Sequence, residues 1–404
     1  MATSTSASVD SASGLVAFGA SPWQDLTNSS TSYTSNTVNL SGRGQEDVMD
    51  TLGQETVAMT GFILYGIVGN VLVVLGLLGN TLSIVVLCNR RMRSSTSYYL
   101  TSLAVYDNFI LVAMLLFFNL QALGIRVPSI DQAYKDYIIP VMIPLGYPLS
   151  LTAQMGSIYT CVAFTVERFV AVCRPLHAAN TCTKSRAKKA ILVIFLWSLL
   201  YNIPRYFHYE VHKVWSNDTG RYDNVMQTTD FGENEVFQHL YIISFQLIFM
   251  FLLPFLIILV LNTALLRAIN RSRKQRQEMS TTDTREHNLT VMLVAVIAVF
   301  LVCQFPTIVD NILVAIVGEQ RHNAVLQYQM LYMVCTVLVT INSSLNFVLY
   351  CLFGKKFRMV LRHILGLKNS GRKSCQYRST IYQSRMNGTK VSQCTTYDME
   401  VSLV

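Results

Sequence analysis

The polar residues with the clearest chemical meaning lie inside stretches that are otherwise apolar. Glu167 and Arg168 stand side by side within SIYTCVAFTVERFVAVCRPL, residues 157–176, and Asp107 directly follows the run LAVY. An arginine at the centre of a bilayer costs about 2.5–3.5 kcal/mol, so this pair must be neutralised or lie near a membrane surface. Such groups in apolar helices indicate binding or switching. An ordinary buried helix with a satisfied ion pair is the alternative.

Catalytic and metal-binding groupings are not predicted. His208 and His212 share one polar segment, His177 and His287 lie in others, and no His, Cys or Asp cluster has the spacing of metal ligands. Isolated surface histidines account for this pattern. We therefore expect a binding protein and not an enzyme.

The composition places most of the chain in a membrane. Of its 404 residues, 51% are hydrophobic and 14% charged, and the mean hydropathy is +0.37. A helix needs about 20 apolar residues to cross a bilayer. Stretches of this kind are read at Phe62–Cys88, Tyr98–Leu123, Ile138–Val172, Lys189–Ile203, Leu240–Leu266, Leu289–Val317 and Leu326–Phe353. The predicted fold is an all-α membrane protein, a bundle of seven transmembrane helices.

The basic residues indicate the orientation of the bundle. Most of the 32 Lys and Arg residues lie within Arg90–Arg93, Arg174–Lys189 and Arg267–Arg285 and after Lys355. The positive-inside rule places these segments in the cytosol, so the amino terminus is predicted to lie outside a plasma membrane. The net charge of +9 thus reflects topology, and nucleic-acid binding is not needed to explain it.

The other segments follow from this topology. Residues 1–58, rich in Ser, Thr, Gly and Asn, are predicted to be a disordered, glycosylated extracellular segment without a cleavable signal peptide. Residues 59–353 form the membrane domain, 354–367 an amphipathic helix on the cytosolic leaflet and 368–404 a disordered tail. The expected glycan sites are Asn28, Asn39 and Asn217. All nine cysteines lie in predicted helices or on the cytosolic side, so no extracellular disulfide is expected.

The order of polar, aromatic and proline residues along the stretches resembles that of the rhodopsin-like, class A G-protein-coupled receptors. The residues that carry the resemblance are Asn80, Asp107, Arg168, Trp197, Pro254, Pro306 and Asn346. The phrases TVERFVAVCRPLHA, YNIPRYF and INSSLNFVLYCLFGKKF further resemble the invertebrate FMRFamide branch of neuropeptide receptors. The resemblance implies a receptor that transmits extracellular ligand binding to a heterotrimeric G protein.

The sequence departs from the pattern of this family at several positions. Ile143 stands where most members have a cysteine that forms a disulfide with the second extracellular loop. That loop, Arg205–Gln238, also contains no cysteine. Gln304 replaces a usual tryptophan, Phe347 a usual proline and Asn262 a usual tyrosine. These changes concern the movement of the sixth and seventh helices and leave the fold prediction intact.

For the cytosolic end, the resemblance implies that Arg168 contacts the G protein. In the resting state it is expected to pair with Glu167 and Glu286, with Tyr350 in the same coupling region. Outward movement of the sixth helix would break the pairing and open a groove for the carboxy-terminal helix of the G protein. The alternative is that Glu286 is a solvated acid that suits the positive end of a helix dipole.

For the bundle centre, the resemblance implies an allosteric sodium ion, and no other cofactor is expected. Its expected ligands are Asp107, Ser157, Asn342 and Asn346. A hydrated polar network without an ordered ion is the alternative. The expected switch residues are Ile158, Pro254, Phe300, Gln304 and Pro306. Plain core packing is the alternative for these residues.

The ligand class is inferred from position 150 and from the charge of the outer loops. Ser150 stands where amine receptors have an aspartate, and Leu326–Phe353 contains no lysine that would bind retinal. The outer loops are acidic, and a carboxylate pairs well with a guanidinium, so a peptide ending in Arg-Phe-amide is expected. The expected pocket residues are Ser150, Gln154, Glu210 and Asp310.

Other functions were weighed against this one. A different peptide, a small ligand or ligand-independent signalling fits the same fold. A transporter or channel would need a polar path or inverted repeats, and neither is seen.

The tail suggests further partners. Its Ser and Thr clusters suit phosphorylation and arrestin docking by resemblance, Cys375 suits palmitoylation, and Ser402 and Val404 fit a PDZ groove by strand addition. The expected partners are thus an extracellular neuropeptide, a G protein, arrestin, a PDZ-domain protein and membrane lipid, without nucleic acid.

Overall fold

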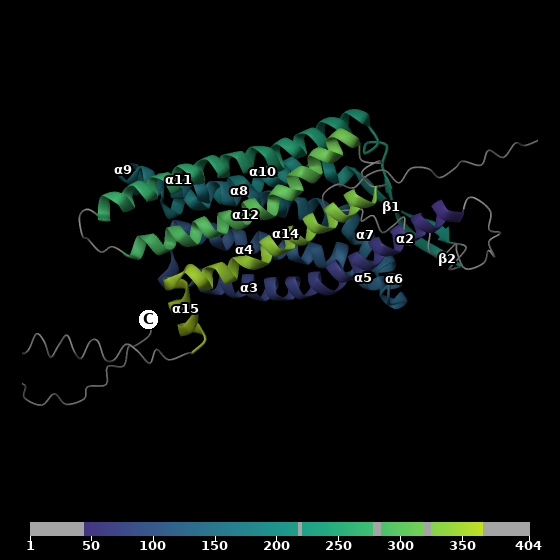
Figure 1. Cartoon of the computed structure of the whole chain (residues 1–404), viewed down its shortest axis with the longest axis horizontal. Coiled ribbons are helices and arrows are strands. Elements are labelled where there is room, and N and C mark those ends of the chain that lie inside the picture. The colour runs from purple at the N-terminus through teal and green to yellow at the C-terminus, as the bar shows by residue number, and fades with distance from the viewer. Residues whose placement is uncertain (1–43, 217–219, 278–283, 319–324, 367–404) are drawn as a thin grey trace, which may run out of the picture.

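Each predicted apolar stretch forms a long helix, and the helices together make one bundle (Figure 1). The computed structural model describes residues 44–216, 220–277, 284–318 and 325–366. Within these residues, seven helices are long and apolar enough to cross a membrane. They are Gly53–Cys88, Ser95–Gly124, Pro128–Cys173, Lys184–Phe207, Phe237–Ala268, Ala298–Val317 and Leu326–Phe353. The prediction of a seven-helix membrane bundle is confirmed for the described part of the chain.

The side chains are distributed as a lipid environment requires. Leu78, Val302 and Ile316 are 66%, 69% and 75% exposed on the surface of the bundle. Asn80 and Asp107 are fully buried inside it. Hydrocarbon offers polar groups no hydrogen-bond partner, so these groups turn inward and the apolar groups turn outward.

The first three spans are built from several helical segments each. The first contains α2 (Gly44–Gly61), η1 (Phe62–Gly69) and α3 (Asn70–Cys88), and η2 (Arg90–Met92) follows it. The second contains α4 (Ser95–Met114), η3 (Leu115–Asn119) and α5 (Leu120–Gly124). The third contains α6 (Pro128–Ala133), η4 (Tyr134–Ile138), α7 (Ile139–Val141), η5 (Met142–Gly146) and α8 (Tyr147–Cys173).

The second half of the chain adds four spans and a hairpin. The fourth span, after α9 (Pro175–Thr181), contains α10 (Lys184–Asn202) and η6 (Ile203–Phe207). The strands β1 (Tyr209–Ser216) and β2 (Arg221–Thr228) precede η7 (Phe237–Leu252) and α11 (Leu253–Gln277). The last helices are α12 (Thr284–Val317), α14 (Leu326–Phe353) and α15 (Lys355–Ile364).

The two ends of the bundle carry different structures. Figure 1 shows the β1–β2 hairpin with α2 and α5–α7 at one end, and α9 and α15 at the other. We call them the hairpin end and the α15 end.

The first helix begins earlier than predicted. Its backbone is helical from Gly44, whereas the predicted disordered segment ran to residue 58. The sequence GQEDVMDTLGQETVAMTG places acidic residues near the positive end of this helix and good helix formers after them. Local helix propensity therefore outweighs the polar composition between Gly44 and Ala58.

The β-hairpin was not predicted. Its strands pair antiparallel from Tyr209 opposite Thr228 to Ser216 opposite Arg221, and Gly220 adopts a positive φ of 64°, which glycine tolerates best. The signal was present in the sequence, because YEVHKVWS and RYDNVMQT flank the turn-forming NDTG.

Polar and aromatic contacts fasten the hairpin to the third span. Arg221 Nη1 lies 3.2 Å from Asp136 Oδ2, and Asn224 Nδ2 donates to the Lys135 carbonyl at 3.0 Å. The rings of Tyr209 and Tyr147 meet edge to face at 5.6 Å. The cysteines within the described residues are all free thiols, so these contacts are non-covalent.

A short helix follows the seventh span, as predicted. In α15, Phe357 and Val360 are each 3% exposed, whereas Lys355 and Lys356 face outward. The Phe357 ring packs against Tyr350 at 5.5 Å, and Arg358 Nη1 donates to the Cys351 carbonyl at 2.7 Å. The helix therefore turns its apolar side toward the end of α14 and its lysines away from it.

Candidate functional site

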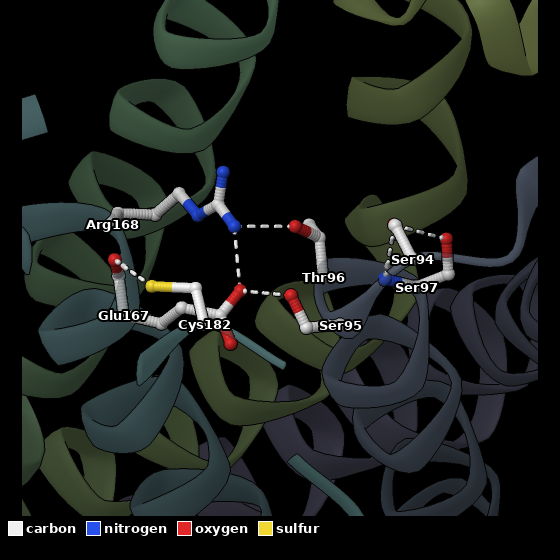
Figure 2. Close-up of polar contacts among 7 residues, drawn as sticks. All are labelled: Ser94, Ser95, Thr96, Ser97, Glu167, Arg168 and Cys182. Atoms are coloured by element: carbon white, nitrogen blue, oxygen red, sulfur yellow. Dashed lines mark hydrogen bonds and ion pairs between the residues drawn. The ribbon is translucent and has the colours of Figure 1, made fainter. Parts of the chain in front are cut away.

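The charged pair of the third span lies at the α15 end of α8 and is held by the start of α4. Arg168 Nη2 lies 2.6 Å from Glu167 Oε1 and donates to Thr96 Oγ1 at 2.5 Å. Ser95 Oγ donates to the same carboxylate oxygen of Glu167 at 3.0 Å. Figure 2 shows the carboxylate and the Thr96 hydroxyl converging on one guanidinium nitrogen.

The local sequence explains why α4 presents these hydroxyls. Ser94 is the N-cap of α4, and its Oγ accepts a hydrogen bond from the Ser97 backbone N–H at 3.2 Å (Figure 2). The cap starts the helix at Ser95, which places Ser95 and Thr96 in the first turn. The prediction missed both residues, although the run SSTS before an apolar stretch is a typical helix-start signal.

The pair is partly shielded from water. The Glu167 side chain is 6% exposed and that of Arg168 is 17% exposed, and the guanidinium carbon lies 5.7 Å from the centre of the Phe164 ring. Cys182 Sγ lies 3.7 Å from the Glu167 carbonyl oxygen. Burial and the nearby Glu167 carboxylate raise the pKa of the Cys182 thiol, which therefore stays protonated.

Of the two other residues expected at this end, Tyr350 does not join the cluster. Tyr350 is 1% exposed, packs on Phe357, and its hydroxyl has no hydrogen-bond partner among the described residues. The side chain of Glu286 lies outside the described residues. The described partners of Arg168 thus come from α8 and α4.

Three of the four predicted sodium ligands meet in the bundle centre. Ser157 Oγ donates to Asp107 Oδ1 at 3.1 Å, and Asn346 Nδ2 donates to Asp107 Oδ2 at 2.6 Å. The carboxylate is completely buried. Asn342 is half-buried and makes no hydrogen bond to Asp107, whereas its neighbour Ser343 is completely buried.

Three of the five predicted switch residues lie in one packed region, and the other two lie further along α12. Ile158 and Phe300 belong to one buried cluster together with Leu103, Cys161 and Ile258. Pro254, one turn before Ile258, is buried beside that turn of α11. Apolar packing at helical spacing accounts for this cluster by itself, so its switching role stays a prediction.

The remaining two switch residues lie further along α12. Gln304 is 4% exposed and its Oε1 has no hydrogen-bond partner among the described residues. Pro306 is half-buried inside α12. A proline within a helix removes one backbone hydrogen bond and is a common cause of a kink.

A small cavity with a volume of about 20 Å³ lies between α4, α8, η7, α12 and α14. Its lining residues are Met114, Gln154, Phe251, Thr307, Asp310, Asn311, Tyr332, Cys335, Thr336 and Val339. Gln154 and Asp310, two of the residues predicted for a ligand pocket, both line this cavity. They are 3% and 2% exposed, and their role in ligand binding stays a prediction.

The other two predicted pocket residues do not line this cavity. Ser150 is 3% exposed and its Oγ donates to the Tyr147 carbonyl one turn earlier at 2.7 Å. Glu210 lies on β1, where its half-exposed carboxylate is 2.9 Å from His212 Nε2. Glu210 thus lies on the surface of the hairpin and outside this cavity, and its contact with a ligand stays a prediction.

A buried arginine at the hairpin end was not predicted. Arg205 is 1% exposed, its Nη1 donates to the Tyr147 hydroxyl at 2.7 Å, and its Nη2 donates to Gln246 Oε1. Its guanidinium also lies 5.8 Å and 5.4 Å from the ring centres of Tyr147 and Tyr241. Arg205 thus joins η6, α8 and η7 directly beneath the hairpin. The signal was an arginine at the end of an apolar span, in YNIPRYF.

The arrangement suits binding and transmission. Among the described residues, no group of three or more His, Cys, Asp and Glu side chains is placed to hold a metal ion. An acid-containing cavity lies toward the hairpin end, a charged cluster lies at the α15 end, and the Asp107 network lies between them. The expected glycan sites Asn28, Asn39 and Asn217, the palmitoylation site Cys375 and the PDZ-binding residues Ser402 and Val404 fall outside the described residues.

Comparison with known proteins identifies similar sequences. The model of the family described as 7 transmembrane receptor (rhodopsin family) matches residues 79–350. The chain is 34% identical over 308 residues to the FMRFamide receptor of Drosophila melanogaster, covering 74% of this chain and 53% of that protein. It therefore spans about half the length of that relative.

Other relatives are matched over more of their own length. The FMRFamide peptide receptor frpr-18 of Caenorhabditis elegans is 30% identical over 300 residues, 73% of this chain and 67% of that protein. Neuromedin-U receptor 1 of Mus musculus is 27% identical over 330 residues, 77% of this chain and 74% of that protein.

Proposed function

Because the chain belongs to the rhodopsin family of seven-transmembrane receptors, we propose that it is a receptor for an amidated neuropeptide of the RF-amide type. In this proposal, the receptor passes the signal to a heterotrimeric G protein. The observation that carries the ligand class is Asp310, a buried carboxylate on the wall of the cavity. The names of the two FMRFamide relatives support the same class.

The proposed orientation puts the hairpin end outside the cell and the α15 end in the cytosol of the plasma membrane. It is supported by the basic residues at the α15 end, including Arg90, Arg91, Arg174, Lys355 and Lys356, since cytosolic segments are enriched in Lys and Arg. In this orientation α15 lies on the inner leaflet with its lysines toward lipid headgroups. The cavity then faces the extracellular ligand.

The peptide terminus is proposed to enter the cavity. A guanidinium pairs with a carboxylate through short charge-assisted hydrogen bonds, so the arginine of the peptide would bind Asp310. Met114, Phe251 and Val339 provide the apolar part of the wall for the phenylalanine ring. The cavity volume of about 20 Å³ is enough for about one water molecule, so in this proposal the surrounding helices move apart to admit the end of the peptide.

We propose a sodium ion for the centre of the bundle. Asp107 and Ser157 supply oxygen ligands, and Asn346 retains its amide oxygen because its Nδ2 is the donor to Asp107. The buried Ser343 Oγ and Asn80 Oδ1 have no hydrogen-bond partner among the described residues, which fits a polar centre that accepts a cation. A bound ion would supply positive charge to Asp107 and favour the resting packing of these helices.

At the α15 end, we propose that Arg168 is held in the resting state and released on activation. Outward movement of α12 would open the groove that receives the G protein, and a kink at Pro306 would serve as its pivot. Arrestin and a PDZ-domain protein are proposed as partners of the tail on sequence grounds alone.

The test is a ligand panel on cells that express the chain. Calcium and cyclic AMP are measured after addition of RF-amide peptides, their free acids and amidated peptides without arginine. We expect a response to RF-amides that falls at least tenfold with Asp310→Asn at equal surface expression. A matched control is Asp131→Asn. Asp131 lies in α6 outside the cavity and is paired with Lys135.

A second peptide class has a specific observation in its favour. The chain also matches neuromedin-U receptor 1 over 74% of that receptor's length. A response to neuromedin-type peptides without one to RF-amides would retain the receptor function and replace the ligand.

A further inference from the structure

Several buried amide oxygens of the described residues have no hydrogen-bond partner, and among these residues Gln154 is the one whose side chain lines the cavity. Asn202 and Asn262 also have an unpaired Oδ1, but they lie away from the cavity, and their nitrogens are paired: Asn202 Nδ2 donates to the Ser198 carbonyl at 2.8 Å, and Asn262 Nδ2 donates to the Ile258 carbonyl. A buried polar atom without a partner is rare in native proteins and calls for an explanation.

Further polar groups on the same wall are also without partners. Thr307 Oγ1 and the Tyr332 hydroxyl line the cavity and make no hydrogen bond to another described residue. These atoms come from three different helices, α8, α12 and α14. Unpaired polar groups from separate helices around one space indicate that the space receives a polar ligand.

The charge of the cavity restricts what that ligand can be. Asp310 lines the cavity, and none of its described lining residues is Lys, Arg or His. A ligand carboxylate placed there would lose its water without gaining a cation, and it would lie near a second carboxylate. A neutral group that donates hydrogen bonds avoids both costs.

We propose that Gln154 recognises the C-terminal carboxamide of the peptide by reciprocal amide pairing. This inference rests on the proposed function and names the residue that separates an amidated peptide from its free acid. In this pairing, Gln154 Oε1 accepts an N–H of the terminal amide while Gln154 Nε2 donates to its carbonyl oxygen. A terminal carboxylate has no proton to donate, so Oε1 would stay unpaired. In this arrangement, Asp310 binds the guanidinium of the peptide and Gln154 binds its C-terminal carboxamide.

The main test compares the affinities of three forms of one RF-amide peptide, ending in carboxamide, methyl ester and free acid. The ester is neutral but has no N–H donor, so it separates hydrogen bonding from charge exclusion. For the unaltered receptor we expect the ester and the acid each to bind at least about tenfold more weakly than the amide. An ester that binds as tightly as the amide would overturn the proposal, because charge exclusion alone would then explain the selectivity.

The variant Gln154→Leu assigns the effect to this residue. We expect the amide to lose its advantage over the ester, because leucine removes the Oε1 acceptor that only the amide can use, whereas the hydrogen bond from Nε2 to the carbonyl is lost for both peptides. The matched control is Gln304→Leu, since Gln304 is also buried with an unpaired Oε1 but does not line the cavity. In Gln304→Leu, any change in affinity should be the same for all three peptides, so the ratios of their affinities should stay unchanged. An unchanged amide-to-ester ratio in Gln154→Leu would overturn the role of Gln154.

A second measurement does not depend on the folding of the Gln154 variant. Cys335 lines the same cavity, so a methanethiosulfonate reagent that blocks peptide binding through this thiol reports occupancy, with Cys335→Ser as the insensitive control. In the unaltered receptor, the amide should protect Cys335 at concentrations at which the ester does not. Equal protection by both would overturn the proposal. Failure of every RF-amide form to bind would instead reject the proposed function itself.

Discussion

The guanidinium of Arg168 on α8 donates a hydrogen bond to the hydroxyl of Thr96 on α4, across 2.5 Å (Figure 2). The expected partners of this arginine were Glu167 and Glu286, and the side chain of Glu286 lies outside the described residues. Among the described residues its partners are Glu167, as expected, and Thr96 of the second span. Contact between α4 and α8 therefore contributes to the resting position of Arg168.

Removal of this hydrogen bond should raise basal signalling. A hydrogen bond to a charged group contributes about 1.5–3 kcal/mol, and even 1 kcal/mol shifts a two-state ratio about fivefold. We therefore expect Thr96→Val to increase ligand-independent G-protein activation, measured per receptor at the cell surface. Thr101→Val is the matched control, because the Thr101 hydroxyl bonds only to the Ser97 carbonyl of its own helix. Equal basal activity in the two variants would contradict this prediction.

Reducing agents should leave the receptor intact, whereas loss of Arg205 should destabilise it. The hairpin is joined to the bundle without a disulfide among the described cysteines, and Arg205 links Tyr147 with Gln246 beneath it. We expect dithiothreitol to leave Tm and peptide binding unchanged.

Substitution of Arg205 tests the same region directly. Arg205→Met removes the two charged hydrogen bonds to Tyr147 and Gln246 and should lower Tm by several degrees, since a hydrogen bond to a charged group contributes about 1.5–3 kcal/mol. Arg205→Lys should recover only part of this loss because lysine lacks the planar fork of donors. Full stability in Arg205→Met would show that the cluster does not hold this end of the bundle.

Acid should destabilise the folded receptor through His208. This histidine stacks on Tyr209 at 3.9 Å, and burial lowers its pKa from 6.5 to about 3. Between these two values the unfolded chain binds a proton that the folded chain does not, so the free energy of unfolding falls as pH decreases from 6.5. At pH 4.5 this amounts to a few kcal/mol.

The measurement for His208 is Tm of the purified receptor as a function of pH. We expect His208→Gln to lose less stability than the unaltered chain between pH 6.5 and 4.5. His212 is half-exposed on the hairpin, and His212→Gln serves as the control for replacing a surface histidine. Parallel pH profiles for His208→Gln and the unaltered chain would refute the prediction.

Sodium should weaken agonist binding, and Asp107 should be required for the effect. Asp107→Asn keeps the size of the side chain and removes the charge that a cation needs, while Ser157 and Asn346 stay in place. We expect replacement of sodium by N-methylglucamine to raise agonist affinity in the unaltered receptor and to have no effect in the variant. Sodium sensitivity that survives in Asp107→Asn would place the ion elsewhere.

Much of the architecture could be predicted because the decisive signals are local. Each span is a continuous apolar run, and the cost of exposing a backbone polar group to lipid makes such a run a helix whatever its neighbours are. The hairpin was missed although its signal is also local, because strand-like alternation over eight residues is weak beside long apolar stretches. The start of the first helix was missed because composition was read over the whole segment and not turn by turn.

The sequence by itself determined the number of spans, the burial of Asp107 and the helix that follows the seventh span, since these depend on residue type and position within one helix. Only the tertiary structure decided which side chains meet. It joined Arg168 to Thr96, kept Asn342 from Asp107, turned Glu210 outward and left Gln154 unpaired beside Asp310. Such pairings depend on how each helix is rotated about its axis against its neighbours. That rotation is set by the packing of all the helices together, and no single stretch of sequence contains it.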